Sequence, residues 1–299
     1  MPDLWELNEA QKEAVLHGEG PARVLAGPGS GKTHVIVKRL ELLVREKKIP
    51  PESILVLTFT RAAAQQMQSR FLRQMGETFY PVRFSTFHSF FYYLIQSDGI
   101  HSADGTDHTL QILSDSEKHS LLQQLQFEYK QHCREKDVPT TEQISQFITQ
   151  QKNGCDRKPE AFKEWQMYSW FLKEYDRRLL SLHRLDLDDL ANRCAELLKE
   201  PACRRRWQQQ FSYVLVDEFQ DINPMQYRVL RLLMKRPANL FVVGDDDQSI
   251  YGFRGSEPGL LRQFVTDYPE SARILLSYNY RSTKKILDTA GLCISQNQN

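Results

Sequence analysis

The segment Leu25–Val35, LAGPGSGKTHV, limits the possible folds of this chain more than any other stretch. It follows a short apolar run and leads into a helical pattern, and its glycines let backbone N–H groups approach a phosphate without Cβ clashes. We predict that a phosphate-binding loop is formed by Ala26, Gly27, Pro28, Gly29, Ser30, Gly31, Lys32 and Thr33. Lys32 would place its charge on the β- and γ-phosphates, and the Thr33 hydroxyl is suited to Mg²⁺. A chance glycine turn is the alternative, but the strand before the loop and the helix after it favour a nucleotide site.

The rest of the chain alternates between strand and helix patterns. The predicted strands are apolar runs rich in β-branched residues: ARVLAG, SILVLTFT, VRFSTF, YVLVDE, NLFVVGD and ARILLSY. These runs are continuous rather than alternating, which is typical of strands buried on both faces of a parallel sheet. Helical patterns lie between them. This order predicts an α/β fold, in which a parallel sheet carries helices on both faces.

The third and fourth of these strand patterns are about 125 residues apart, far more than an ordinary connection needs. Most of the gap has helical periodicity with capping signals, for example in TTEQISQFITQQKNG. We therefore predict an all-helical subdomain inserted into the sheet domain. The predicted boundaries are 1–97 and 211–285 for the two parts of the sheet domain, 98–210 for the insertion and 286–299 for the start of a second domain.

Polar side chains follow two of the later strand patterns at the point where each apolar run stops. In YVLVDEFQD, Asp217 is suited to hold Mg²⁺ through water, and Glu218 is suited to polarise the attacking water. Gln220 follows, and the run NLFVVGD leads to Gln248, whose amide could bond the γ-phosphate and sense its loss. Because ligands of open α/β sheets bind at the carboxyl ends of the strands, we expect these groups to meet Lys32 at one edge. A solvent-exposed Asp-Glu pair is the alternative, which a P-loop in the same chain disfavours.

Composition leaves the binding partner open. The formal net charge is +1 and the isoelectric point is about 7.7, so any nucleic-acid-binding surface must be local. The polar N-terminus lacks the apolar core of a secretory signal, and no run is long enough to cross a bilayer. The five cysteines form no C-x-x-C pair, which favours reduced thiols over a metal cluster. We expect a soluble cytoplasmic protein.

Seven motifs, taken together, resemble the UvrD/Rep family of superfamily 1 DNA helicases. In chain order they are LNEAQKEAV (Q motif), AGPGSGKT (motif I), TFTRAAAQQM (motif Ia), STFHSF (motif Ib), VDEFQD (motif II), VGDDDQSIYGFRG (motif III) and LSYNYRS (motif IV). A single match of this kind is weak, whereas seven in the order of the family cover nearly the whole chain. The resemblance implies a RecA-like P-loop NTPase domain, with the helical insertion in the place of the family's domain 1B.

The resemblance also implies ATP with Mg²⁺ and assigns roles to particular residues. Gln11 would read the adenine edge, Tyr280 would stack on the base and Arg281 would reach the γ-phosphate. The residues with implied catalytic roles are Lys32, Glu218, Gln248 and Arg281, and Gln220 would belong to the nucleotide site. Single-stranded DNA would lie across the sheet domain on Thr58, Phe59, Arg61, Thr86, His88, Tyr251, Phe253 and Arg254. Core packing is the alternative for Phe59 and Phe253.

Three of the motifs depart from the family pattern. His34 stands where the family often has an arginine that contacts the nucleotide. Arg61-Ala62 replaces the usual Asn-Lys of motif Ia, and Arg61 could still bind a phosphate. Phe253 stands where tryptophan is more frequent, which keeps stacking with a smaller face.

The chain ends at Asn299, just after motif IV. In the family, motifs V and VI follow, and motif VI supplies an arginine to the γ-phosphate from a second motor domain. We expect a motor half that binds Mg–ATP and single-stranded DNA, including junctions with duplex, and that hydrolyses ATP slowly by itself. A second motor domain or a partner protein would supply the arginine, and the full-length protein would move 3′ to 5′. The alternative is a nucleotide-gated DNA-binding or regulatory module without unwinding activity of its own, and an unrelated P-loop kinase or ATPase fits the motifs poorly.

Overall fold

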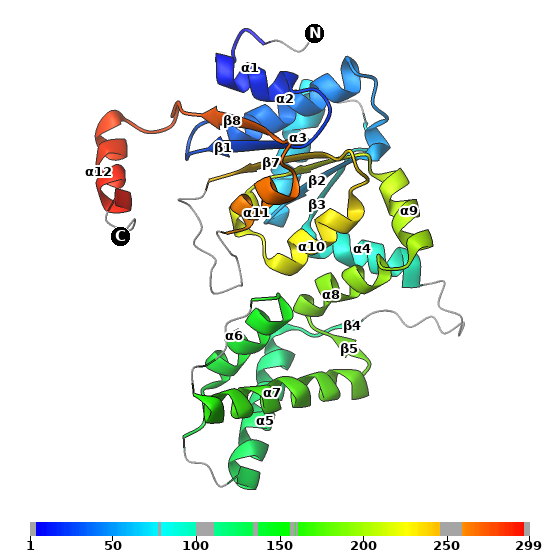
Figure 1. Ribbon diagram of the computed structural model, residues 1–299, viewed down its shortest axis with the longest axis vertical. Helices are drawn as coiled ribbons and strands as arrows, with labels where there is room; N and C mark the ends of the chain where they lie inside the picture. The colour runs from blue at the N-terminus through cyan, green and yellow to red at the C-terminus, as the bar shows by residue number, and fades with distance from the viewer. Residues whose placement is uncertain are drawn as a thin grey trace.

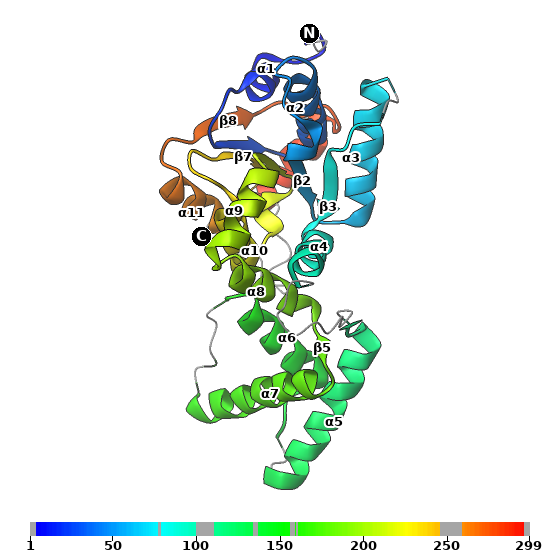
Figure 2. The ribbon, with the colours of Figure 1, turned by 90° about the vertical axis from the view of Figure 1, so that its right-hand side faces the viewer.

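The computed structural model of the chain describes residues 4–76, 79–99, 111–133, 137–155, 159, 161–245 and 259–295. Figure 1 shows two parts, a sheet flanked by helices and, below it, a group of helices. Figure 2 shows the same two parts from the side. The chain begins in the sheet part, passes through the helical part and returns to the sheet part.

The strands described in the sheet part form one parallel six-stranded sheet in the order β3-β2-β6-β7-β1-β8. Their bounds are β1 (Ala22–Ala26), β2 (Ile54–Thr58), β3 (Arg83–Thr86), β6 (Tyr213–Val216), β7 (Asn239–Gly244) and β8 (Ala272–Leu276). Each predicted strand pattern forms one of these strands, and the predicted α/β class is confirmed. Leu25 of β1 and Gly244 of β7 are register partners. The P-loop and the segment after β7 therefore start side by side.

The inner strands β2, β6 and β7 are buried on both faces over nearly their whole length, which explains their continuous apolar sequences, whereas the edge strand β8 is partly exposed. All residues of β2 are buried. Leu55 and Leu57 pack in one hydrophobic core, whereas Ile54 and Val56 pack in the other. Because alternate residues of a strand point to opposite faces, a strand covered on both sides needs an apolar side chain at every position.

Helices cover both faces of the sheet (Figure 1). One face packs against α1 (Glu9–Leu16), α2 (Lys32–Arg45) and α3 (Arg61–Gln74). The opposite face packs against α4 (Phe87–Gly99), α8 (Leu187–Leu197), α9 (Pro201–Gln210), α10 (Pro224–Leu233) and α11 (Leu260–Asp267). The short 3₁₀ helices η1 (Pro51–Ser53) and η2 (Phe219–Asp221) precede β2 and follow β6, respectively.

The helical part has its own hydrophobic core. It is built from α5 (Asp115–Cys133), α6 (Thr141–Lys152) and α7 (Phe162–Ser181), beside the short parallel pair β4 (Gln111–Ile112) and β5 (Arg184–Leu185). Both α8 and α9 fall within the predicted insertion 98–210, yet they pack in the core of the sheet part. By packing, the helical part therefore extends from β4 to β5, and the predicted domain boundaries stay a prediction.

Buried ion pairs join the helical part to the start of α8. Asp186 is the N-cap residue of α8 and forms a capping box with Asp189. The ammonium group of Lys118 lies 2.8 Å from Asp186, and that of Lys152 lies 2.7 Å from Asp189. The Tyr175 hydroxyl donates to Asp186 at 3.0 Å. The acidic sequence DLDDL thus begins a helix and binds lysines of the neighbouring helices.

One helix lies apart from the packed cores. In Figure 1, α12 (Lys284–Ser295) stands to one side of the sheet, and Ile286 and Leu292 on it are exposed. Among the described residues, no helix is both long enough and apolar enough to cross a membrane. Among the described residues, Cys133, Cys194 and Cys203 carry free thiols.

Candidate nucleotide-binding site

The loop between β1 and α2 has the backbone of a phosphate-binding turn. Gly29 (φ 72°) and Gly31 (φ 90°) adopt left-handed conformations, which residues with a side chain rarely adopt. A Cβ atom on Gly31 would lie 2.8 Å from Nε2 of Gln11, and one on Gly29 would lie 2.6 Å from Cβ of Arg281. Both conformation and space therefore require glycine at these two positions.

Polar groups of the same loop surround the start of α2. The Ser30 hydroxyl donates to the Gly27 carbonyl at 2.7 Å and closes the turn. Thr33 lies in the first turn of α2, where the free N–H groups and the helix dipole favour an anion. His34 follows, and its pKa is lowered by burial and, next to that, by the charge of Lys38. The His34 ring is therefore neutral at pH 7, unlike the arginine that the family often has there.

The P-loop lysine is paired with a carboxylate from another strand end. Lys32 Nζ lies 2.8 Å from Oε2 of Glu218, the second residue after β6. The same oxygen accepts a hydrogen bond from Gln220 Nε2 at 2.7 Å. Glu218 has φ 52°, a left-handed conformation that is uncommon for a residue with a side chain. The carboxylate is thus held in a strained turn directly opposite the lysine.

Asp217 is the buried acid next to Glu218. Its side chain accepts the Glu218 N–H at 3.1 Å, and the residue is 6% exposed. Burial and, next to it, the negative charge of Glu218 raise the pKa of Asp217 to about 7. The same two causes raise the pKa of Asp221 to about 6. Shifted carboxyl groups gathered beside a P-loop lysine are typical of a functional site.

The donors at this edge fit Mg²⁺ bound together with a nucleotide. Mg²⁺ prefers oxygen ligands and usually takes one or two carboxylates, with phosphate oxygens and waters completing its shell. Asp217 offers a buried carboxylate whose charge the protein only partly compensates, and Thr33 offers a hydroxyl at the start of α2. In the described part of the chain, no group of three or more His, Cys, Asp or Glu residues could hold a metal by itself.

Three side chains line the other side of the P-loop. The Gln11 amide donates to the Ser30 carbonyl at 3.0 Å and is 4% exposed. Asn8 caps α1, and its amide donates to the Tyr280 hydroxyl at 2.7 Å. The Tyr280 N–H donates to the Gly29 carbonyl at 2.9 Å, while its ring is largely exposed. An exposed ring fixed beside a P-loop is suited to stack on a base.

Asn279 is a site residue that the sequence reasoning missed. Its amide donates to the Pro28 carbonyl, and its side-chain oxygen accepts the N–H groups of Arg281 and Ser282, each at 2.8 Å. This arrangement holds the segment after β8 against the P-loop. An Asn just after an apolar run such as ARILLSY is a turn signal, so this contact had a local signature. The role of Asn8 also had a local signature, since an Asn followed three residues later by Gln predicts a capping box.

The structure brings most of the predicted nucleotide residues together. Lys32, Glu218 and Gln220 are in contact, Gln11 contacts the loop, and Tyr280 and Arg281 lie against Gly29. The predicted residue Gln248 lies outside the described residues. The catalytic and binding roles of all these residues stay predictions.

The residues predicted to bind DNA lie at the ends of β2 and β3. Thr58 and Thr86 are register partners and both are buried. Their hydroxyls donate within the chain, to Thr60 O at 3.0 Å and to Ser89 Oγ at 2.9 Å, respectively. Of the other predicted contacts, Phe59 and His88 are partly exposed and Arg61 is exposed, whereas Tyr251, Phe253 and Arg254 lie outside the described residues.

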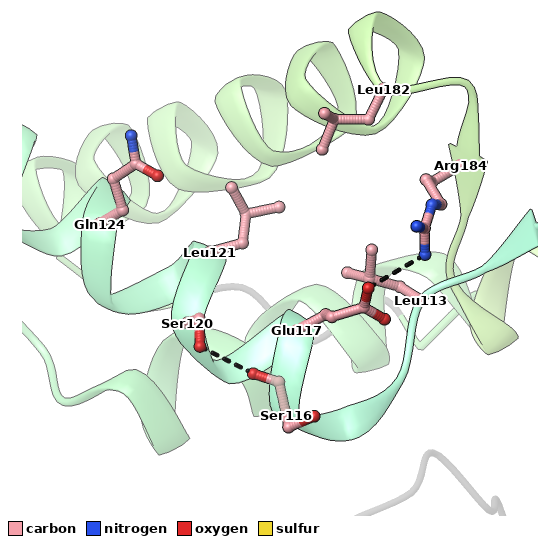
Figure 3. A pocket seen from close by; sticks show the side chains of 8 residues that line it. All are labelled: Leu113, Ser116, Glu117, Ser120, Leu121, Gln124, Leu182 and Arg184. Carbon is pink, nitrogen blue, oxygen red and sulfur yellow. Dashed lines mark hydrogen bonds and ion pairs between the residues drawn. The ribbon is translucent and has the colours of Figure 1, made fainter.

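A groove of about 420 Å³ lies elsewhere, between α5, α7 and β5 in the helical part. Figure 3 shows that its wall includes Leu121 and Leu182, and that Glu117 and Arg184 form an ion pair across it, 3.1 Å apart. No predicted site residue lines this groove.

A parallel sheet, a P-loop between its strand and helix, and carboxylates at a neighbouring strand end define a P-loop NTPase fold. Residues 7–269 match the family model of the UvrD/REP helicase N-terminal domain. The chain belongs to this family, and the resemblance noted from the motifs is confirmed.

Similar proteins are bacterial helicases. The chain is 37% identical over 299 residues to YjcD of Bacillus subtilis (strain 168), covering 98% of this chain and 39% of that protein. It is 37% identical over 307 residues to the ATP-dependent DNA helicase PcrA of Staphylococcus epidermidis, covering 97% of this chain and 40% of PcrA. The PcrA of Staphylococcus aureus is 35% identical over 310 residues, with 98% and 40% covered. The chain thus spans about two fifths of the length of these relatives.

Proposed function

We propose that this chain is the ATP-binding motor domain of an ATP-dependent DNA helicase or translocase. It binds Mg–ATP at the P-loop and single-stranded DNA at the carboxyl edge of β2 and β3. One observation carries the proposal: Lys32 of the P-loop pairs with Glu218 after β6, and Gln220 links Glu218 to Asp245 after β7. Three strand ends are thereby connected through side chains.

The Lys32–Glu218 pair suggests how triphosphate binding prepares the water-activating carboxylate. Both groups are partly buried, so their attraction is only partly screened by water. A triphosphate carries more negative charge than one carboxylate and would take Lys32 as its partner. Glu218 would then be free to accept a proton from the attacking water. Mg²⁺, held by Asp217 and Thr33, would supply charge neutralisation on the phosphates.

Gln220 would pass the state of the nucleotide site to the segment that follows β7. Its amide nitrogen holds the Glu218 carboxylate, and its oxygen holds the Asp245 N–H at 3.0 Å. Movement of Glu218 on triphosphate binding would therefore pull on Asp245 through one side chain. The motif that follows Asp245 is predicted to reach DNA, so the two ligands would be coupled.

DNA binding is proposed for the edge formed by the ends of β2 and β3. Arg61 is exposed at the first turn of α3, where it could meet a phosphate, and the Phe59 ring is partly exposed. Aromatic stacking on bases tolerates any sequence, which suits a protein that moves along DNA. Movement from 3′ to 5′, action at junctions with duplex, the domain boundaries given above and a cytoplasmic location are part of the same proposal.

Nucleotide binding tests the proposal most directly. We expect the chain to bind a fluorescent ADP analogue in the presence of Mg²⁺ and the Lys32→Ala variant to lose at least about ten-fold in affinity, since hydrogen bonds to charged groups contribute about 1.5–3 kcal/mol. Lys47→Ala is the matched control, because Lys47 lies after α2, beyond the end of the helix that starts at the P-loop. Equal affinities of Lys32→Ala and the unaltered chain, with unchanged circular dichroism, would overturn the proposal.

A further inference from the structure

Arg39 is a buried cation on α2 to which no predicted site role was given. The residue is 2% exposed. Its Nη1 donates to the carbonyls of Ala14 (3.4 Å), Val15 (3.3 Å) and His17 (2.6 Å), and its Nη2 donates to that of Gly18 (3.1 Å). All four carbonyls belong to the last turn of α1 or to the residues directly after it. The guanidinium of Arg39 therefore caps the carboxyl end of α1 with hydrogen bonds.

The carboxyl end of α1 needs such a partner. The last carbonyls of a helix have no partner within the helix, and the helix dipole favours a cation at this end. The last turn of α1 contains no basic residue of its own. Arg39 supplies both the hydrogen bonds and the charge from α2. Figure 2 shows α1 lying beside α2 at the top of the sheet part.

The charge of Arg39 is not used by a carboxylate. In the described part of the chain, its hydrogen bonds go to backbone carbonyls and not to a carboxylate. The guanidinium also lies 4.6 Å from the centroid of the Phe241 ring on β7. Burial lowers its pKa to about 10, so Arg39 remains charged at neutral pH. Burying a charge is costly unless it is hydrogen-bonded, and here the bonds from Nη1 and Nη2 go to the end of α1 and the residues after it, while Nε has no partner among the described residues.

The opposite end of α1 lies at the candidate nucleotide site. Gln11 donates to Ser30 of the P-loop at 3.0 Å, and Asn8 donates to the Tyr280 hydroxyl at 2.7 Å. With eight residues, α1 is too short to be stable by itself, and it depends on the buried side chains of Ala14 and Val15 and on the contacts at its two ends. A shift at its carboxyl end is therefore passed to Asn8 and Gln11.

We propose that Arg39 is a positioning residue for the base side of the nucleotide site. By capping α1 from α2, it holds Asn8 and Gln11 against the P-loop and Tyr280. Helix α2, which begins at Lys32, would bind the phosphates, and α1 faces the base. The two are joined by Arg39 at the carboxyl end of α1 and by the Gln11–Ser30 hydrogen bond near its start. This inference rests on the proposed nucleotide-binding function.

A comparison of two ligands tests this role. ADP reaches both the base side and the P-loop, whereas inorganic pyrophosphate reaches the P-loop alone. By isothermal titration calorimetry with Mg²⁺, we expect Arg39→Lys to weaken ADP binding about ten-fold, the size of one or two hydrogen bonds, and pyrophosphate binding by less than about two-fold. Lysine keeps the charge but has no planar fork that could serve four carbonyls. Arg39→Met should lose more, and if it does not fold, Arg39→Lys remains the informative variant.

A double-mutant cycle separates this role from a general loss of stability. Gln11→Ala should show the same selective loss for ADP, and combining it with Arg39→Lys should add little, because both changes act on the same contact. Arg45→Lys is the matched control, since Arg45 lies on the same helix but binds Glu41 at 3.0 Å. It should leave both affinities unchanged.

Each contrary result has a defined meaning. Equal losses for ADP and pyrophosphate, additive losses in the double variant, or an unchanged ADP affinity in Arg39→Lys would overturn the positioning role. If the unaltered chain binds neither ligand, or if Lys32→Ala changes neither affinity, the proposed function fails instead. A selective loss in Gln11→Ala without one in Arg39→Lys would contradict the role of Arg39 alone.

Discussion

The side-chain oxygen of Gln220 accepts the backbone N–H of Asp245 at 3.0 Å, while the amide nitrogen of the same side chain donates to Glu218 at 2.7 Å. Gln220 is 3% exposed, and its oxygen would lie 2.8 Å from a Cβ atom on Gly244. A single buried amide therefore bridges the ends of β6 and β7, and any side chain at Gly244 would disturb it.

Replacing Gln220 by alanine should uncouple DNA binding from the nucleotide. We expect Gln220→Ala to keep its ADP affinity within about three-fold, because Lys32 and Thr33, the P-loop residues predicted to serve the phosphates and Mg²⁺, are unchanged. The affinity for a fluorescent oligo(dT) strand, measured by anisotropy at one salt concentration, should no longer change when a non-hydrolysable ATP analogue is added. Gln208→Ala, which removes an amide bound to Leu232 and Met234 carbonyls, serves as the control. A nucleotide-dependent change that survives in Gln220→Ala would contradict the bridge.

The two glycines Gly31 and Gly18 should respond differently to the same substitution. Gly31→Ala places a Cβ atom 2.8 Å from Gln11 Nε2 at a residue with φ 90°, whereas a Cβ on Gly18 meets nothing within 4 Å. We expect Gly31→Ala to lower the free energy of unfolding by about 1–2 kcal/mol through backbone strain and to weaken ADP binding. Gly18→Ala should change neither quantity. Urea unfolding and ADP titration check both, and equal behaviour of the two variants would count against the geometry of the loop.

Asn279 should matter for nucleotide affinity through the P-loop rather than through contact with a base. Asn279→Ala removes the amide bound to Pro28 and the oxygen that accepts from Arg281 and Ser282, whereas Asn279→Asp keeps that oxygen. We expect ADP binding to weaken about five- to ten-fold in the alanine variant and less in the aspartate variant. Asn239, the first residue of β7, accepts a hydrogen bond from the Gly20 N–H. Asn239→Ala removes this bond and should leave ADP binding unchanged. An alanine variant with unaltered affinity would show that the segment is held by other contacts.

The buried Lys118–Asp186 pair should make stability depend on pH. Burial by itself raises the pKa of Asp186, but the charge and hydrogen bond of Lys118, together with the charge of Lys152 and the hydrogen bond from Tyr175, outweigh it. The pKa therefore lies below its ordinary value of 3.8. A lowered pKa in the folded state means that Asp186 contributes stability above about pH 4, which is lost as the pH falls through the folded-state pKa.

Removing Lys118 tests this dependence. Lys118→Met should cost about 3 kcal/mol or more at pH 7, because it leaves a buried carboxylate without its nearest cation. The difference from the unaltered chain should shrink as the pH falls and Asp186 becomes protonated in the variant. Lys199→Met breaks an exposed pair with Glu196 and should change nothing. Thermal unfolding followed by circular dichroism from pH 7 to pH 3 measures the difference, and a gap that does not depend on pH would refute the assignment.

The strands and the P-loop were predictable because their signals are local. A strand buried on both faces must be apolar throughout, as in β2, and a loop that approaches phosphate needs glycine at Gly29 and Gly31. The position of the acids was predictable for a similar reason, since a parallel sheet brings its carboxyl ends to one edge. Even so, the pairing of Lys32 with Glu218 is a geometric detail that spacing alone does not contain.

Long-range contacts were beyond the sequence. Arg39 lies in an ordinary amphipathic pattern on α2, and nothing near it indicates that its guanidinium reaches carbonyls 21 to 25 residues earlier. Periodicity likewise predicted helices over most of the insertion without indicating that α8 and α9 pack on the sheet rather than on α5–α7. Packing partners are decided by the whole fold, and a helical repeat reports only which face is buried.

Helix α8 begins in the ion pairs around Asp186 and continues along α4, in the core of the sheet part. Because α4 starts directly after β3, α8 joins the buried ion pairs of the helical part to the helix that begins at the end of β3. We therefore expect a change in the position of the helical part to be felt, through α8 and α4, beside the edge where the polynucleotide is expected to lie.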